Sequence, residues 1–224
     1  MELIETFFNW DILLRSFPIL MRGLWNTVVL ACASIVVGTS AGLLLCLVRL
    51  YAPKPIRLLA VAYIDIFRAL PILVLLILIY YALPFVGIRF SSFVSALLAL
   101  SMVLAAFTAE VCRAGIQNVP AGQFEAAATL GMPFWLGMRK IILPQAVKVI
   151  IPPLTSNSIA VFKDTALASV VAMPDLLKQA QDTQALMANP TPLIGAAIIY
   201  LALLWPLVRI VGYLEARNQR LQMR

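Results

Sequence analysis

The sequence contains no histidine, which removes the most common general base and the most common metal ligand of proteins. It contains neither the G-x-x-x-x-G-K-[ST] phosphate loop nor the G-x-G-x-x-G dinucleotide fingerprint. Charged residues are scarce as well, at 12% of the chain. We therefore expect no catalytic residue, no metal site, no cofactor and no nucleotide site in this chain itself.

Cysteine is also rare. Cys32, Cys46 and Cys112 lie within or at the end of apolar stretches, and this is typical of buried thiols, not of disulfides or metal ligands.

The chain is rich in apolar side chains, with 62% hydrophobic residues and a mean hydropathy of +0.97. A soluble domain of 224 residues cannot bury that much apolar surface, so the composition predicts an integral membrane protein.

Several apolar runs are long enough to cross a bilayer as helices. About 20 apolar residues span the ~30 Å hydrocarbon layer, and a helix satisfies its own backbone hydrogen bonds there. The alternation typical of a β-barrel is absent. Four runs qualify outright, and a fifth is interrupted by Pro152, Pro153, Asn157, Lys163 and Asp164. The predicted fold is an all-α membrane protein, a single domain over residues 1–224 with five transmembrane helices over residues 23–48, 69–86, 92–112, 147–173 and 193–211.

Positive charges gather on alternate connections of this predicted topology. Lysine and arginine are retained on the cytoplasmic side, and they are concentrated in residues 49–68, residues 113–148 and the C-terminal tail. This predicts an extracytoplasmic N-terminus and a cytoplasmic C-terminus. Residues 1–22 are then an extracytoplasmic interfacial lead-in without a cleaved signal peptide, residues 113–147 a cytoplasmic loop and residues 212–224 a cytoplasmic tail. The net charge of +7 is explained by this topology, so we expect no nucleic acid partner.

Two local patterns bear on helix packing. Gly38 and Gly42 are four residues apart in the first span, where they either permit close packing of another helix or face lipid. Acidic and basic residues three apart on predicted helices are expected to form local ion pairs, and two such pairs occur: Asp65 with Arg68, and Glu110 with Arg113.

The connection over residues 113–147 carries helix start and stop signals. Pro120 can start a helix, and Gly131 can end it in a left-handed cap. Pro133 then starts a second helix that we expect to stop at Pro144. The result is a compact helix–turn–helix that presents the Glu125 carboxylate, a shape that suits a groove on a partner.

The spacing within this loop is specific. Glu125-Ala126-Ala127, Gly131, Ile141 and Leu143-Pro144 resemble the EAA loop of permease subunits in ATP-binding cassette importers. Nearly the whole chain is similar to the polar amino acid branch of these permeases, through the segments GLWNTVVL from Gly23, AYIDIFRALPILVLL from Ala62, AEVCRAGIQNVPAGQ from Ala109 and NSIAVFKDTALASVV from Asn157. The resemblance implies a type I importer permease in a bacterial inner membrane.

The resemblance also implies partners. Two cytoplasmic ATP-binding subunits would dock on the loop through Glu125, Ala126, Ala127, Gly131, Leu143 and Pro144. A second permease copy or a paralogue would complete the pathway, and an extracytoplasmic binding protein would deliver an amino acid. Two questions stay open at this point. Glu125 either bonds to the ATPase or caps its own loop, and the loop as a whole could be a solvated connector.

Polar residues in the interrupted run over residues 147–173 need a protein or water environment, because each costs several kcal/mol in hydrocarbon. Asn157 and Asp164 are two helical turns apart and can share one face, and Asp164 can receive the ammonium group of an amino acid. Lys163 would meet the carboxylate of that amino acid only if the helix bends or a partner subunit helps. Alternatively, Lys163 and Asp164 form the extracellular end of the span and pair with each other or with water.

The resemblance supports the first interpretation, because in this branch the corresponding positions lie near the substrate. The predicted pathway residues are Asn157, Ser158, Lys163, Asp164 and Thr165, together with Leu70. Relatives commonly read Phe-Arg-Gly-Thr-Pro where this chain has Phe67-Arg68-Ala69-Leu70-Pro71, so Leu70 is expected to affect substrate choice.

We therefore expect the transmembrane subunit of an ATP-driven amino acid importer, which couples transport to a separate ATPase by alternating access. Two other functions remain open on sequence alone. One is a stand-alone secondary transporter or channel subunit. The other is a membrane enzyme that uses Asp164 or Glu110 as an acid or base.

Overall fold

The structure is a computed structural model that describes residues 7–222, and these residues contain no strand. Residues 1–6 and 223–224, at the outer ends of the predicted lead-in and tail, lie outside the described residues. The helices in chain order are α2 (Trp10–Tyr51), α3 (Lys54–Ala69), α4 (Ile72–Ile77), the π-helix η1 (Leu78–Ala82), the 3-10 helix η2 (Leu83–Val86), α5 (Ser92–Gln117), α6 (Ala121–Thr129), α7 (Phe134–Gly137), the π-helix η3 (Met138–Ile142), α8 (Leu143–Asp164), the 3-10 helix η4 (Thr165–Val171), α9 (Leu176–Met187) and α10 (Thr191–Gln222).

Helices α2 and α5 form the central pair of the bundle. A Cβ atom added to Gly38 would lie 2.9 Å from the Cβ of Leu104, and one added to Gly42 would lie 2.5 Å from the Cβ of Thr108. Only glycine lets the two helices approach this closely. The predicted close packing is confirmed, and the lipid-facing alternative is wrong for both glycines.

Three helices are long and apolar enough to cross a membrane: α2, α5 and the Thr191–Tyr213 part of α10. A fourth crossing results if α3 and the segment Ile72–Val86 count as one span, although they are bent by 104°. The predicted span over residues 69–86 therefore starts at a sharp bend, and α3 precedes it. Helix α8 has 22 residues, but its polar residues lower its hydropathy. Length and composition thus account for three or four crossings among the described residues, fewer than the five predicted.

Helix α8 differs from the expectation at both ends. It runs without a break through Pro152 and Pro153 and ends at Asp164, where η4 continues the chain as a tighter 3-10 helix. The prediction that a helix stops at Pro144 is wrong, because α7 continues through η3 into α8. The N–H group of Leu143 bonds to the Met138 carbonyl across this π turn, which shifts the hydrogen-bond register just before the proline.

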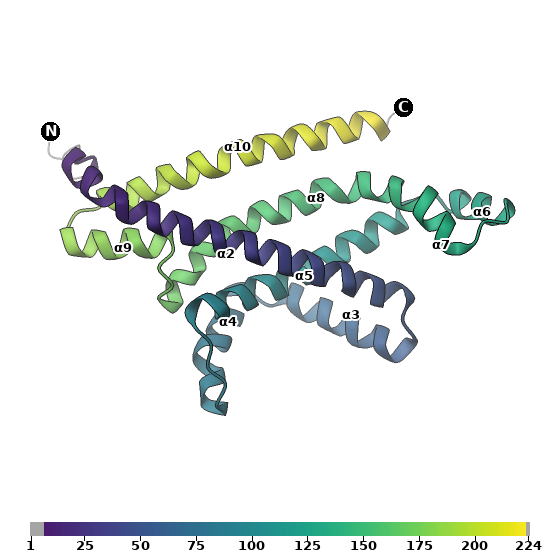
Figure 1. Cartoon of the computed structure of the whole chain (residues 1–224), viewed down its shortest axis with the longest axis horizontal. Coiled ribbons are helices and arrows are strands. Elements are labelled where there is room, and N and C mark those ends of the chain that lie inside the picture. The colour runs from purple at the N-terminus through teal and green to yellow at the C-terminus, as the bar shows by residue number, and fades with distance from the viewer. Residues whose placement is uncertain (1–6, 223–224) are drawn as a thin grey trace.

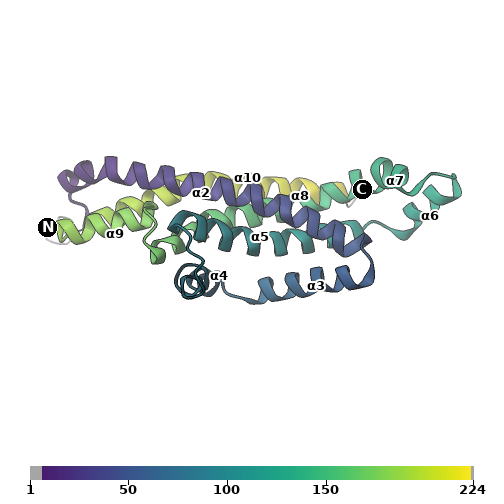
Figure 2. The same cartoon turned by 60° about the horizontal axis from the view of Figure 1, so that its bottom comes forward.

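The two ends of the bundle differ (Figures 1 and 2). The start of α2, the start of α10 and all of α9 share one end, whereas α6 and α7 lie at the other, toward which α2 ends and α3 begins. After the bend, α4 projects sideways from the bundle (Figure 1). Asn9 caps α2, because its side-chain oxygen accepts the Ile12 N–H at 3.1 Å. Residues 10–22 of the predicted lead-in are therefore part of the long helix α2.

Candidate functional site

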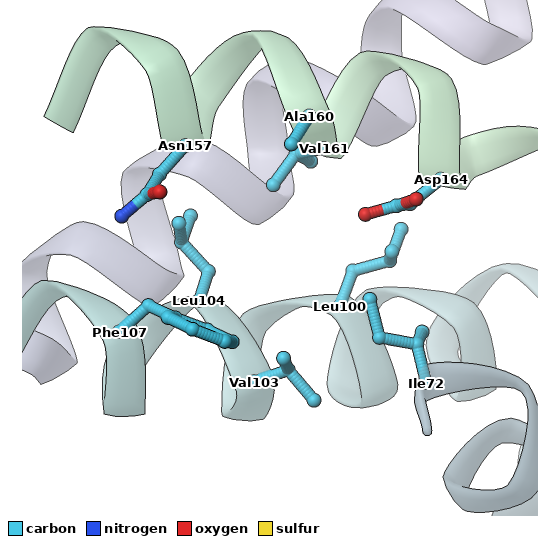
Figure 3. Close-up of a pocket in the computed structure, with 9 residues that line it drawn as sticks. All are labelled: Ile72, Leu100, Val103, Leu104, Phe107, Asn157, Ala160, Val161 and Asp164. Carbon is cyan, nitrogen blue, oxygen red and sulfur yellow. The ribbon is translucent and has the colours of Figure 1, made fainter. Parts of the chain in front are cut away.

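A cavity of about 230 Å³ lies between α5 and α8, close to the start of α4. Most of its wall is apolar, and its polar lining comes from one amide and one carboxylate, both on α8 (Figure 3). The lining residues are Ile72 from α4, Leu100, Val103, Leu104 and Phe107 from α5, and Asn157, Ala160, Val161 and Asp164 from α8.

Asn157 and Asp164 lie at opposite ends of the cavity, and both side chains point toward α5 (Figure 3). The prediction that they share one face of a helix is confirmed. Both residues are half-buried, and among the described side chains, residues 7–213, no hydrogen bond or ion pair reaches either of them. Lys163 is exposed and forms no ion pair with Asp164 in this part of the chain. A small molecule in the cavity would therefore meet a free amide and a free carboxylate.

The other predicted pathway residues do not line this cavity. Ser158 and Thr165 donate their hydroxyl hydrogens to backbone carbonyl groups of the preceding turn, and Thr165 is fully buried. Lys163 is exposed on another side of α8. Leu70 ends α3 two residues before Ile72, and Ile72 is the residue of this segment that lines the cavity.

Three guanidinium groups converge on the single carboxylate of Glu110, in the half of the bundle nearer α6 and α7. Arg49 Nη1 lies 2.5 Å from Oε2, Arg113 Nη2 lies 2.5 Å from Oε1, and Arg68 Nη1 lies 3.8 Å from Oε2. The predicted Glu110–Arg113 pair is confirmed. The predicted Asp65–Arg68 pair is absent from the described residues, because Arg68 turns toward Glu110 while Asp65 stays exposed.

Arg68 also connects this charge cluster with the cavity. Its Cζ atom lies 5.7 Å from the ring centroid of Phe107, within the range of a cation–π interaction. Phe107 lines the cavity at the end where Asn157 lies (Figure 3). Sequence reasoning missed this role, because Arg68, Glu110 and Phe107 come from different helices and no local spacing links α3 to α5.

The loop between α5 and α8 has the predicted helix end. Gly131 has a φ of 66°, in the left-handed region that glycine adopts without strain. The Met132 N–H donates to the Ala127 carbonyl at 3.1 Å, and the Gly131 N–H donates to the Ala128 carbonyl at 2.9 Å. This pair of bonds is a Schellman motif, so the predicted glycine cap is confirmed.

Most of the predicted coupling residues lie on the surface of this loop. Glu125, Ala126, Gly131, Leu143 and Pro144 are exposed. Ala127 is buried and packs against Gly137, where an added Cβ would lie 3.2 Å from the Ala127 Cβ. Among the side chains of residues 7–213 no hydrogen bond reaches the Glu125 carboxylate, and α6 has no side-chain cap, so Glu125 does not cap its own loop in this structure.

An apolar pocket of about 230 Å³ opens beside these residues. It lies between α6 on one side and α7 with η3 on the other, and its wall includes Phe124, Ala128 and Phe134. The loop therefore presents the exposed Glu125 carboxylate close to an apolar recess.

Comparison with known proteins identifies the group to which the chain belongs. The family model described as "binding-protein-dependent transport system inner membrane component" matches residues 15–220. The chain belongs to this family. Two curated permeases match over most of their length. The L-cystine transport system permease protein TcyB of Bacillus subtilis is 35% identical over 94% of this chain and 92% of its own. The glutamate/aspartate import permease protein GltK of Escherichia coli is 32% identical over 94% and 98%.

Solved structures agree with this inner membrane component family. An amino acid ABC transporter crystallised with histidines has a chain that is 36% identical, with a TM-score of 0.86 over 91% of this chain and 96% of that one. The inward-facing MetNI methionine transporter, at 24% identity and a TM-score of 0.67, shares the fold. The predicted fold class, an all-α membrane permease of type I ATP-binding cassette importer architecture, is confirmed, and so is the prediction of a permease subunit.

Proposed function

We propose that this chain is the translocation subunit of an ATP-driven amino acid importer. The observation that carries the proposal is the cavity between α5 and α8, which offers a free amide and a free carboxylate to a small polar ligand. Relatives that match nearly the whole chain are named as permeases for cystine and for glutamate and aspartate, and the similar solved transporter holds histidines. These substrates are all free amino acids.

In this proposal the cavity is one stage of the pathway, with Asn157 and Asp164 in contact with the substrate. Alternating access would expose the cavity first to one side of the membrane and then to the other. Ser158, Lys163, Thr165 and Leu70 lie off the cavity in this state, and their roles as pathway residues would require other states of the cycle.

The loop over residues 113–147 is the proposed coupling element. Glu125, Ala126, Gly131, Leu143 and Pro144 would contact a cytoplasmic ATP-binding subunit, while Ala127 would hold α6 against α7. ATP hydrolysis would belong to that subunit, and this chain would transmit the motion without catalysing a reaction. The packing of α6 against α7 and η3 supports this role, because η3 continues into α8, which carries Asn157 and Asp164.

The proposed setting is a bacterial inner membrane, with five crossings formed by α2, the bent segment α3–η2, α5, α8 and α10. The N-terminus would then be extracytoplasmic and the C-terminus cytoplasmic. A second permease copy or a paralogue and an extracytoplasmic amino-acid-binding protein would complete the importer.

The test is reconstitution of the chain into proteoliposomes with its ATP-binding subunit and its binding protein. We expect uptake of a labelled amino acid that requires ATP and is lost in the Glu125→Lys variant, while membrane insertion of that variant is retained. Uptake by the permease alone, driven by an ion gradient, would favour a secondary transporter instead.

A further inference from the structure

The cavity has a charge pattern that points to one class of amino acid. Asn157 and Asp164 are seven residues apart on α8, which corresponds to about 10 Å along a helix. The ammonium and carboxylate groups of every α-amino acid are attached to the same carbon atom. The α-groups of one substrate therefore cannot reach both ends of the cavity, and something else in the substrate must meet the second end.

A cationic side chain, that of Arg68, lies near the Asn157 end of the cavity. Arg49 and Arg113 both contact Glu110 at 2.5 Å. These two arginines already neutralise the Glu110 charge without the more distant Arg68. Arg68 is the third guanidinium at 3.8 Å, its side chain is 39% exposed, and it lies against Phe107 of the cavity wall. A guanidinium with no dedicated counter-ion binds a carboxylate well, through paired hydrogen bonds.

The Asp164 end of the cavity carries a negative charge and favours a cationic group. Its carboxylate points into an otherwise apolar part of the cavity, beside Leu100 and Ile72 (Figure 3). Among the side chains of residues 7–213 it has no hydrogen-bond or ion-pair partner, and the charge that interacts with it is that of the exposed Lys163, which does not line the cavity. A neutral side chain would leave this half-buried charge without a partner inside the cavity, and an acidic side chain would place two carboxylates together.

We infer that the permease selects amino acids with long cationic side chains, such as lysine and arginine, an inference that rests on the proposed import function. Arg68 binds the α-carboxylate, the Asn157 amide oxygen accepts from the α-ammonium, and Asp164 binds the side-chain cation. Leu100, Val103 and Leu104 contact the methylene groups between them. Arg68 then recognises the α-carboxylate that all amino acids share, and Asp164 recognises the side-chain cation that distinguishes this class.

The experiment measures equilibrium binding of labelled lysine, arginine, glutamine and glutamate to the purified permease–ATPase complex in nanodiscs. The binding protein is left out, so that selectivity belongs to the permease. Lysine and arginine are expected to bind about ten- to a hundredfold more tightly than glutamine and glutamate, the effect of one charged hydrogen-bonded contact. The Asp164→Asn variant is expected to lose this difference, and Asp164→Lys to favour glutamate.

The Arg68→Gln variant separates the two contacts, because it is expected to weaken binding of all bound amino acids by a similar factor. Arg57→Gln, an exposed arginine on the same helix, serves as the matched control and should bind like the parent. Size-exclusion profiles identify any variant that fails to assemble. Glutamine or glutamate binding as tightly as lysine would overturn the inference and leave the amino acid importer intact. Failure of the complete importer to take up any amino acid would overturn the proposed function as well.

Discussion

Gly42 on α2 faces Thr108 on α5 so closely that a Cβ atom at Gly42 would lie 2.5 Å from the Thr108 Cβ. Gly42→Ala must therefore push the central helix pair apart, and we expect it to lower the free energy of unfolding by about 1–3 kcal/mol. Thermal unfolding of the purified chain in detergent measures the effect.

Gly122 provides the matched control for this prediction. It lies in α6 with no atom near its added Cβ, so Gly122→Ala should be neutral or slightly stabilising. Equal stability of the two variants would contradict the close contact between α2 and α5.

Glu110 joins three helices through its guanidinium partners. Glu110→Gln leaves Arg49, Arg68 and Arg113 together without an anion, and we expect a loss of about 1–3 kcal/mol in unfolding free energy. Asp65→Asn, which removes an exposed carboxylate, should change stability by less than about 0.5 kcal/mol. A double variant with Arg49→Gln should recover part of the loss, and strictly additive effects would argue against a shared network.

Asp175 lies between η4 and α9, outside the membrane-spanning segments, and caps α9 by accepting the Lys178 N–H at 2.9 Å. Burial raises the pKa of this carboxyl group to about 6, against an ordinary value near 4. The folded protein thus binds the Asp175 proton more tightly than the unfolded chain does. Its contribution to stability is complete below about pH 4 and is lost as the pH rises through about 6.

Replacement of Asp175 by asparagine tests this sign. Asparagine retains the cap but does not titrate. Between pH 4 and pH 7 the free energy of unfolding of Asp175→Asn should therefore fall by about 3 kcal/mol less than that of the parent. Asp182→Asn, at an exposed position of the same helix, should keep the pH profile of the parent. A parent protein whose stability rises over this pH range would contradict the assignment.

The sequence was sufficient for features with local causes. The apolar runs are continuous stretches of sequence, and the Gly131 cap and the shared face of Asn157 and Asp164 depend on residues within two helical turns of one another, so the sequence predicts them. The course of α8 was harder to predict, because Pro144, Pro152 and Pro153 are strong helix breakers on their own. The π turn η3 precedes Pro144, and the helix α8 runs on through the other two prolines.

The charge network around Glu110 and the bend after α3 could not be predicted from the sequence, because both depend on tertiary packing. Arg68 is three residues from Asp65 in the sequence, but tertiary packing directs it to Glu110 on another helix. The hydropathy of residues 69–86 gives no signal for a bend of 104°, although Pro71 marks its place. The number of crossings could not be predicted from hydropathy for a related reason, because α8 carries polar residues and two of them, Asn157 and Asp164, line the cavity.

Gly131 controls the geometry of the proposed coupling loop. Valine at a φ of 66° is strained, so Gly131→Val should disturb the cap between α6 and α7 and abolish recruitment of the ATP-binding subunit. Gly131→Asn should retain recruitment, because asparagine tolerates this backbone conformation. Co-purification of the ATP-binding subunit is the measurement, and membrane insertion of both variants is the control. Normal recruitment by Gly131→Val would remove the cap from the coupling mechanism.

The small number of cysteines makes the proposed orientation directly testable. After replacement of Cys32, Cys46 and Cys112, a single cysteine at the exposed position of Gly122→Cys reports on the loop, and Ala185→Cys reports on α9 at the other end of the bundle. In intact cells with a permeabilised outer layer, a membrane-impermeant thiol reagent should label Ala185→Cys and spare Gly122→Cys until the inner membrane is opened. The reverse pattern would place the loop where no cytoplasmic ATPase can reach it. Because positive residues determine which connections stay inside, that outcome would also invalidate the charge argument for the topology.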